Sequence, residues 1–130
     1  MTKIVSFLKL IFHSSILFLI IISLFPGSLL GLMFYGDISK QPDLIPEAFG
    51  ISINHFIFYF YVSVLGLVLY VKNEKFKVFL YSLFVLSVIL EALHLVVPNR
   101  TFEIGDLAGN VFGVLAAYFL VNIYLSLKKR

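Results

Sequence analysis

Three pairs of polar residues at helical spacing are the groups in this sequence most suited to chemistry. They are Glu91 and His94, His55 and Tyr59, and Asp106 and Asn110. Residues three or four apart share one face of a helix, so each pair can act from one surface. Carboxylates and imidazoles perform general acid–base chemistry, and with amides and hydroxyls they also bind polar ligands. The pairs therefore predict either a binding site or a catalytic site.

These pairs lie within or beside long apolar runs. The chain has 130 residues, of which 61% are hydrophobic and 13% are charged, and its mean hydropathy is +1.04. Soluble domains have about 25% charged residues, so the composition excludes a soluble enzyme and also a disordered segment. One membrane span takes about 20 apolar residues. The chain is therefore expected to be an all-α integral membrane bundle of four transmembrane helices.

The apolar runs and their breakers predict one transmembrane domain over residues 1–130. The expected helices are 8–35 with a kink at Pro26, 51–71, 78–97 and 105–127. Pro98 is expected to end the third helix, because proline cannot continue the backbone hydrogen bonding. The stretch 36–50 holds two prolines and two glycines, which is typical of a loop.

The basic residues predict how the helices are oriented. Eight of the ten Lys and Arg residues lie at the two chain ends or between the second and third helices, and only Lys40 and Arg100 lie in the other two connections. Cytoplasmic loops carry the excess of basic residues, so both termini are expected to be cytoplasmic. Basic residues at the edges of spans, rather than on one face, indicate no nucleic-acid partner. Cysteine is absent, which excludes disulfides.

In this topology the three polar pairs converge. Glu91 and His94 lie near the outer end of the third helix, His55 begins the second, and Asp106 begins the fourth. Arg100 lies in the connection between the last two helices. Ionisable residues at membrane depth are costly and usually face the bundle interior. The pattern therefore predicts a polar site just beneath the outer face.

Small residues recur every four positions in the fourth helix. Gly105, Gly109 and Gly113 form the row, and Ala117 continues it. Such rows allow two helix backbones to approach closely. The row is interpreted mainly as packing within the chain, and the alternative is a homodimer formed through Gly105, Gly109 and Gly113.

The same stretch resembles the VanZ-like family of small bacterial integral membrane proteins. The motif residues are Glu91-Ala-Leu-His94, Pro98-Asn-Arg100, Asp106 and Asn110-Val-Phe-Gly113, with Ser23-Leu-Phe-Pro26-Gly27 and His55-Phe-Ile-Phe-Tyr59 upstream. The resemblance covers roughly residues 20–120. Histidine stands at position 94 where the family usually has glutamine, and Ile51-Ser52 replaces its usual Asp-Lys pair.

The resemblance implies a multi-pass protein of the bacterial cytoplasmic, or inner, membrane. The founding member of the family is linked to low-level resistance to the antibiotic teicoplanin, which acts on the cell wall. The resemblance thus implies an accessory or binding protein of the cell envelope. Its expected ligand is a membrane lipid, a lipid-linked envelope precursor or another amphipathic molecule.

The expected ligand-binding residues combine one cation with two acids, an amide, an imidazole and a phenol. Arg100 is expected to hold an anionic group through two hydrogen bonds. The residues expected to orient the ligand around it are Glu91, Asp106, Asn110, His55 and Tyr59.

Two other functions remain open on the sequence alone. One is a membrane-embedded enzyme in which Glu91 with His55 or His94 acts as general acid and base on a lipid-linked substrate. The other is a dimeric proton-coupled exporter that uses Glu91. No cofactor is expected. A metal set of His55, Glu91 and His94 is conceivable, but a single Glu-x-x-His is half of what a four-helix di-metal site needs, so no metal is predicted.

Overall fold

The computed structural model describes residues 3–42, 45–71, 74 and 76–128, and within these the fold is all-helical. The helices are α1 (Lys3–Leu24), α2 (Leu29–Tyr35), α3 (Ile53–Tyr70), α4 (Phe76–Leu93) and α5 (Ile104–Lys128). Among these, α1, α3, α4 and α5 are long and apolar enough to cross a membrane. The prediction of four spans is confirmed.

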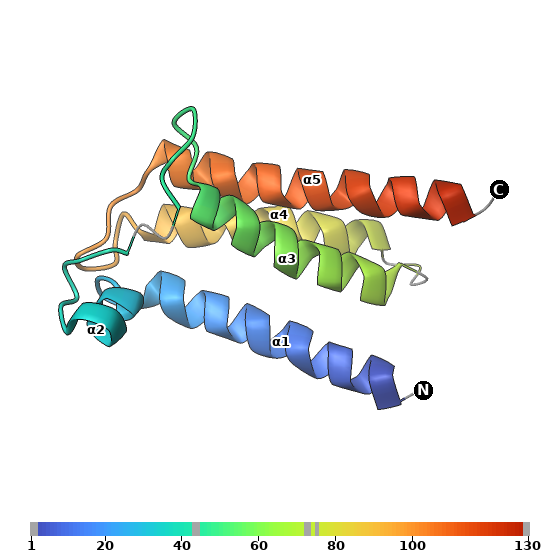
Figure 1. Cartoon of the computed structure of the whole chain (residues 1–130), viewed down its shortest axis with the longest axis horizontal. Helices are drawn as coiled ribbons and strands as arrows, with labels where there is room; N and C mark the ends of the chain where they lie inside the picture. The colour runs from blue at the N-terminus through green and yellow to red at the C-terminus, as the bar shows by residue number, and fades with distance from the viewer. Residues whose placement is uncertain (1–2, 43–44, 72–73, 75, 129–130) are drawn as a thin grey trace.

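The axes of the four long helices are roughly aligned and successive helices are antiparallel, so the two chain ends lie at the same end of the bundle (Figure 1). Helices α3 and α4 have 18 residues each, which corresponds to about 27 Å at 1.5 Å per residue. That length matches the hydrocarbon core of a bilayer, about 30 Å. The short helix α2 and the long connections lie together at the opposite end (Figure 1).

The first apolar run forms two separate helices instead of one kinked helix over 8–35. Helix α1 ends at Leu24, and Gly27 takes a left-handed conformation with φ +84°. The Ser28 side chain then accepts a hydrogen bond from the Gly31 N–H at 2.9 Å and caps α2. A proline followed by a left-handed glycine ends the first helix, and the serine begins the next one. The Gly27 N–H donates to the Pro98 carbonyl at 3.1 Å, which ties this break to the α4–α5 connection.

Helix α4 ends at Leu93, four residues before the predicted end at Val97. From His94 onward the backbone hydrogen bonds span three residues instead of four. The His94 N–H donates to the carbonyl of Glu91, and the Leu95 N–H donates to that of Ala92. The residue before a proline disfavours helical geometry, so Pro98 affects the preceding turn as well. As a result, His94 lies just beyond the helix.

The glycine row of α5 packs against α3 of the same chain. A Cβ atom added at Gly109 would lie 2.5 Å from the Ser52 carbonyl oxygen, and one added at Gly113 would lie 2.6 Å from that of Phe56. These contacts are with backbone atoms, so only glycine fits without moving α3. The interpretation as packing within the chain is confirmed, because Gly109 and Gly113 are buried against the α3 segment. The homodimer stays a prediction.

The apolar core lies between all four long helices. Val62 and Leu67 of α3 and Val114 and Ala117 of α5 are almost fully buried. Helix α1 contributes Leu19 to this core, and its Phe12, which is 5% exposed, packs against Tyr70 of α3 and Phe79 of α4. The bundle is therefore tightest around α3 and α5.

A short turn before α3 projects beyond the bundle. Ala48 and Ile51 form an isolated β-bridge, and Phe49 at the tip has φ +55° and a fully exposed side chain. The Gly50 carbonyl would lie 2.8 Å from a Cβ added at Gly105, so the turn rests directly on the start of α5.

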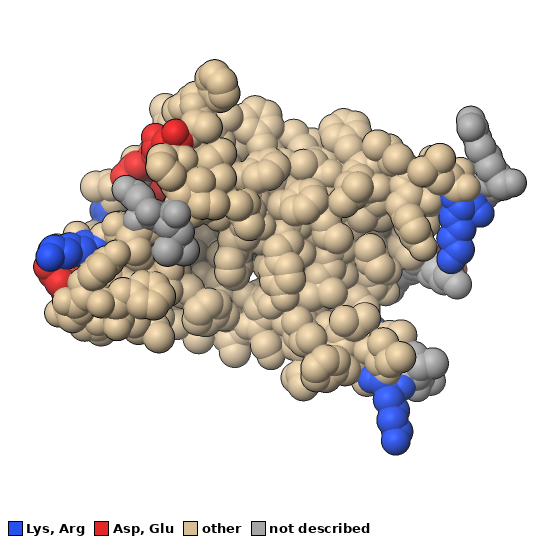
Figure 2. Space-filling model, viewed as in Figure 1, with Lys and Arg blue, Asp and Glu red and all other residues tan. Residues whose placement is uncertain are grey.

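Charged residues occupy the two ends of the bundle. On the face shown in Figure 2 the middle of the molecule is free of them. Basic residues lie at the end that holds the termini, and acidic residues lie together with basic ones at the other end. Four of the basic residues that carry the predicted orientation, Lys72, Lys75, Lys129 and Arg130, lie outside the described residues. The cytoplasmic placement of the termini stays a prediction.

Candidate functional site

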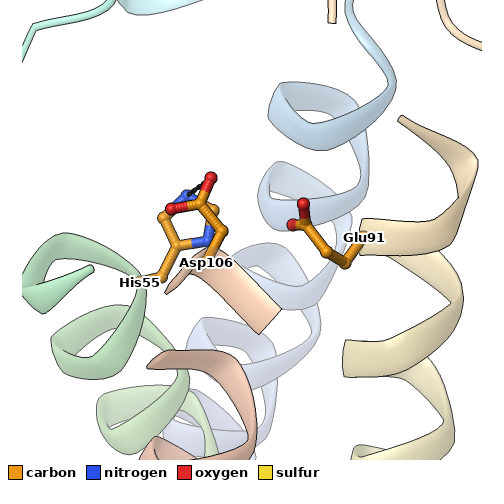
Figure 3. Close-up of side chains that lie close together, drawn as sticks. All are labelled: His55, Glu91 and Asp106. Carbon is orange, nitrogen blue, oxygen red and sulfur yellow. Dashed lines mark ion pairs between the residues drawn. The ribbon is translucent and has the colours of Figure 1, made fainter. Parts of the chain in front are cut away.

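All three predicted polar pairs meet at the end of the bundle that carries α2 and the long connections. His55 and Tyr59 lie in the first two turns of α3, and Glu91 lies in the last turn of α4. Asp106 and Asn110 lie in the first two turns of α5. Antiparallel neighbours place these helix ends side by side, so the predicted convergence is present in the structure (Figure 3).

Glu91 is the most deeply buried carboxylate of the site, with 1% of its surface exposed. Its Oε1 atom accepts a hydrogen bond from the Glu103 backbone N–H at 3.1 Å and lies 3.2 Å from His94 Nδ1. The spacing of three residues between Glu91 and His94 predicted that they would share a face. A buried carboxylate requires such partners, because burying an unpaired charge is very unfavourable.

His94 is 4% exposed, and its Nε2 atom is buried without a hydrogen-bond partner. Its Nδ1 atom is occupied by Glu91. His94 therefore positions Glu91, and the structure gives it no second polar contact.

His55 connects α3 to α5. Its Nδ1 atom lies 3.0 Å from Asn110 Oδ1, and its Nε2 atom lies 3.6 Å from Asp106 Oδ2. Asn110 Nδ2 donates to the Ser87 carbonyl of α4 at 3.4 Å. Asn110 thus links three helices, which explains why an amide is buried at this position.

Asp106 combines a role at the start of a helix with a role in the site. It lies in the first turn of α5, where a negative charge is favoured by the helix dipole. It also faces His55 in the site and forms a side-chain hydrogen bond with Ser52. Ser52 was not predicted as a site residue, although a serine just before a helix is a typical cap and could have been found by that signal.

Arg100 lies against the end of α1. Its Nη2 atom donates to the Ile22 carbonyl at 2.6 Å, and Nε donates to the Phe25 carbonyl at 3.4 Å. The last carbonyls of a helix have no partner within the helix, and Arg100 provides one. Burial lowers the pKa of Arg100, while the nearby carboxylates of Glu91 and Asp106 oppose that shift.

These residues surround a cavity of about 670 Å³. Its polar lining includes His55, Glu91, His94, Arg100, Asp106 and Asn110, together with Gln41, Glu47 and Glu103 from the connections. Its apolar lining includes Phe18, Leu19 and Ile22 from α1 and Ile57, Phe58 and Tyr59 from α3. The cavity lies where α1 departs from the tight α3–α5 pair.

Tyr59 lines the cavity and is buried, as its pairing with His55 on one helix face predicted. Gln41 was not predicted, and it accepts a hydrogen bond from Arg100 Nη1 at 3.4 Å. It lies in a loop, where no periodic pattern marks a residue as part of a site. Glu47 and Glu103 form a second acidic group around Asp106 at the surface end of the cavity.

Searches of curated proteins and of solved structures find no match to this chain. A family model described as VanZ/LLP1 matches residues 8–125, which is nearly the whole chain and includes all of the site helices. Together with the four apolar helices, this match establishes a multi-pass membrane protein. The protein belongs to the VanZ/LLP1 family.

Proposed function

We propose that this protein binds an amphipathic ligand at the outer face of the bacterial cytoplasmic membrane and acts as an accessory or binding protein of the cell envelope. The observation that carries the proposal is the cavity of about 670 Å³ with a polar end and an apolar wall. Ligand sites typically combine an apolar lining with a few converging polar groups.

The two kinds of lining suit the two parts of an amphipathic molecule. Glu91, His55 and Asp106 supply the polar end, where a headgroup would exchange hydrogen bonds. Phe18 of α1 and Ile57 of α3 line the apolar wall, and their side chains are 45% and 47% exposed. In a bilayer these side chains contact acyl chains, so a ligand tail has an apolar path between α1 and α3.

The distribution of basic residues supports an outer-leaflet location. Lys3, Lys9 and Lys128 lie at the end that holds the termini, whereas Lys40 and Arg100 lie at the cavity end. By the positive-inside rule, the first end is cytoplasmic and the cavity opens toward the outer surface. The candidate ligands are then membrane lipids, lipid-linked envelope precursors and amphipathic antibiotics, which would connect the protein to antibiotic resistance.

The role of Arg100 in this proposal changes from that predicted on the sequence. Its guanidinium donates to the carbonyls of Ile22 and Phe25, so it supports the cavity wall instead of being free to clamp an anion. The headgroup contacts therefore fall mainly to Glu91, Asp106 and His55.

Native mass spectrometry of the protein purified in mild detergent tests the proposal. We expect wild type to retain a lipid or lipid-linked molecule and the Glu91→Gln and Asp106→Asn variants to lose most of it. Glu74→Gln is the matched control, since Glu74 is exposed in the α3–α4 turn and lies outside the cavity. Thermal unfolding must show that the variants are folded. Ligand-free wild type, or equal retention by wild type and both variants, would contradict the proposal.

The cluster of acids and imidazole also favours a second function, an enzyme acting on a lipid-linked substrate. His55 Nε2 lies 3.6 Å from Asp106 Oδ2 inside a cavity, which is an arrangement suited to general acid–base chemistry. Mass analysis of lipid-linked diphosphates incubated with the protein separates the two functions. A product that wild type forms and Asp106→Asn does not form indicates an enzyme, whereas recovery of the unchanged lipid indicates binding alone.

A further inference from the structure

Three titratable side chains from three different helices aim their polar atoms at one point in the cavity. His55, Glu91 and Asp106 each place a possible ligand atom within 4.8 Å of the other two. Figure 3 shows the imidazole and the two carboxylates facing the same space from α3, α4 and α5. Two carboxylates held this close in a buried site repel each other unless a proton or a cation lies between them.

The hydrogen bonds of Asn110 fix which nitrogen of His55 is free. Because Asn110 Nδ2 donates to the Ser87 carbonyl, its Oδ1 atom is the acceptor that faces His55. His55 Nδ1 therefore carries the proton in that 3.0 Å hydrogen bond. Nε2 is then the nitrogen that faces Asp106 Oδ2, at 3.6 Å, and in the neutral ring it offers a lone pair to a cation bound between them. Metal-binding histidines show this pattern, in which the second ring nitrogen donates to a carbonyl or amide oxygen.

Glu91 is held in a comparable way. Its Oε1 atom takes the hydrogen bond from the Glu103 N–H and the contact with His94 Nδ1. Its Oε2 atom carries neither of these. The contacts of Oε1 thus fix the orientation of the carboxylate, and Oε2 takes no part in them.

We infer that His55, Glu91 and Asp106 bind a divalent transition-metal ion such as Zn²⁺. One imidazole and two carboxylates suit such an ion, and three protein ligands leave a coordination position open toward the cavity. Ligand atoms around tetrahedral zinc lie about 3.4 Å apart when the metal–ligand distances are about 2.1 Å. The 3.6 Å separation of His55 Nε2 and Asp106 Oδ2 is close to that value.

The ligand set differs from the conceivable set of His55, Glu91 and His94. His94 Nδ1 is already paired with Glu91, and its Nε2 atom is buried without a partner. Asp106 takes the place of His94 as the third ligand. Asp106 and Glu91 lie on different helices, so spacing within one helix could not predict that they are neighbours. His94 and Asn110 become the supporting contacts of the ligands.

The inference rests on the proposed function in one respect, which is the chemistry of the bound headgroup. Without an ion, the two carboxylates would repel a phosphate, and Arg100 is directed to the end of α1. A divalent ion in this position supplies the missing positive charge and offers an open position to a phosphate oxygen. The ion thus makes the cavity specific for lipids with phosphate headgroups.

The inference is tested without any lipid by titrating Zn²⁺ into the chelator-treated protein in detergent and measuring the heat of binding by calorimetry. We expect wild type to bind one equivalent and the His55→Gln and Asp106→Asn variants to bind at least tenfold more weakly. His13→Gln is the control, because His13 is an exposed histidine of α1 and lies outside the cavity. No binding by wild type, or equal binding by wild type and His55→Gln, would overturn the inference.

The neighbouring group of Glu47, Glu103 and Asp106 shares one carboxylate with this site, so it needs its own control. Zn²⁺ binding that survives His55→Gln and is lost in Glu47→Gln would place the ion there and overturn the inference. Electron spin-echo spectroscopy of Cu²⁺-loaded wild type requires no variant, and we expect nitrogen coupling from one imidazole. Coupling from none or from two would reject this ligand set.

The two proposals fail separately. Lipid retention without Zn²⁺ binding would remove the metal site and leave the binding function. Zn²⁺ binding without any retained lipid would remove the binding function and leave the metal site.

Discussion

Helices α5 and α1 contact the rest of the bundle in different ways. Helix α5 packs on α3 through backbone contacts, because a Cβ added at Gly109 or Gly113 would lie within 2.6 Å of a carbonyl oxygen of the other segment. Helix α1 is held by side chains, including Arg100 donating to the Ile22 carbonyl. The contact between α5 and α3 leaves no space between the helices, whereas the contact of α1 with the bundle leaves a cavity. The site residues of α3 and α5 therefore lie on the closely packed side, and α1 forms the opposite wall of the cavity.

The most severe test of this comparison is a large side chain in the glycine row. In Gly109→Leu the new side chain must displace the Ser52 backbone, and we expect a loss of about 3 kcal/mol in the free energy of unfolding, the upper end for overpacking. Thermal and denaturant unfolding in detergent measure it. Ser126→Thr adds a methyl group to an exposed position of the same helix and serves as control. An unchanged stability of Gly109→Leu would mean that α3 and α5 are not in backbone contact.

A smaller effect is expected from releasing α1. Arg100→Met keeps much of the side-chain volume and removes the donors to the Ile22 and Phe25 carbonyls. Hydrogen bonds from charged groups contribute about 1.5–3 kcal/mol, so we expect a loss of about 2 kcal/mol, with faster hydrogen exchange at the end of α1 than in α5. Lys40→Met is the control at an exposed basic residue. Equal increases in exchange in α1 and α5 would contradict separate attachment.

The smallest effect is expected from a conservative substitution of His94. Glutamine, which the VanZ-like pattern has at this position, can still donate to Glu91, and the buried Nε2 atom of His94 has no partner to lose. We expect His94→Gln to change the free energy of unfolding by less than about 0.5 kcal/mol, whereas His94→Leu leaves Glu91 short of a donor and costs about 1–3 kcal/mol. Equal losses for both variants would show that the ring itself, rather than its hydrogen bond, stabilises the site.

Much of this arrangement follows from the sequence, because hydrophobic length and helical spacing are local properties. The four spans, the pairing of Glu91 with His94 and the packing of the glycine row could all be predicted. The pairing of His55 with Asp106 could not, since spacing within a helix does not say which residue of a neighbouring helix lies opposite. The sequence could predict that the polar residues gather near one face of the membrane, but it could not predict which of them contact each other across helices.

The position of Arg100 shows a second limit. Counting charges near the outer face indicated a cation for a ligand, and this ligand contact of Arg100 stays a prediction. The count did not reveal that the Arg100 guanidinium donates to the end of α1. The signal that could have found this lies in Pro26 and Gly27, because a helix that ends abruptly leaves carbonyls in need of a donor. The early end of α4 likewise depends on how Pro98 tightens the preceding turn, which a hydropathy pattern does not record.

The projecting turn at Phe49 has a practical consequence. Its left-handed backbone directs a fully exposed phenyl ring away from the fold, while its base rests on the start of α5 beside Asp106. The chain contains no tryptophan. The indole of a Phe49→Trp variant would therefore be the only one in the protein, and its emission would report directly whether the projecting turn meets water or lipid.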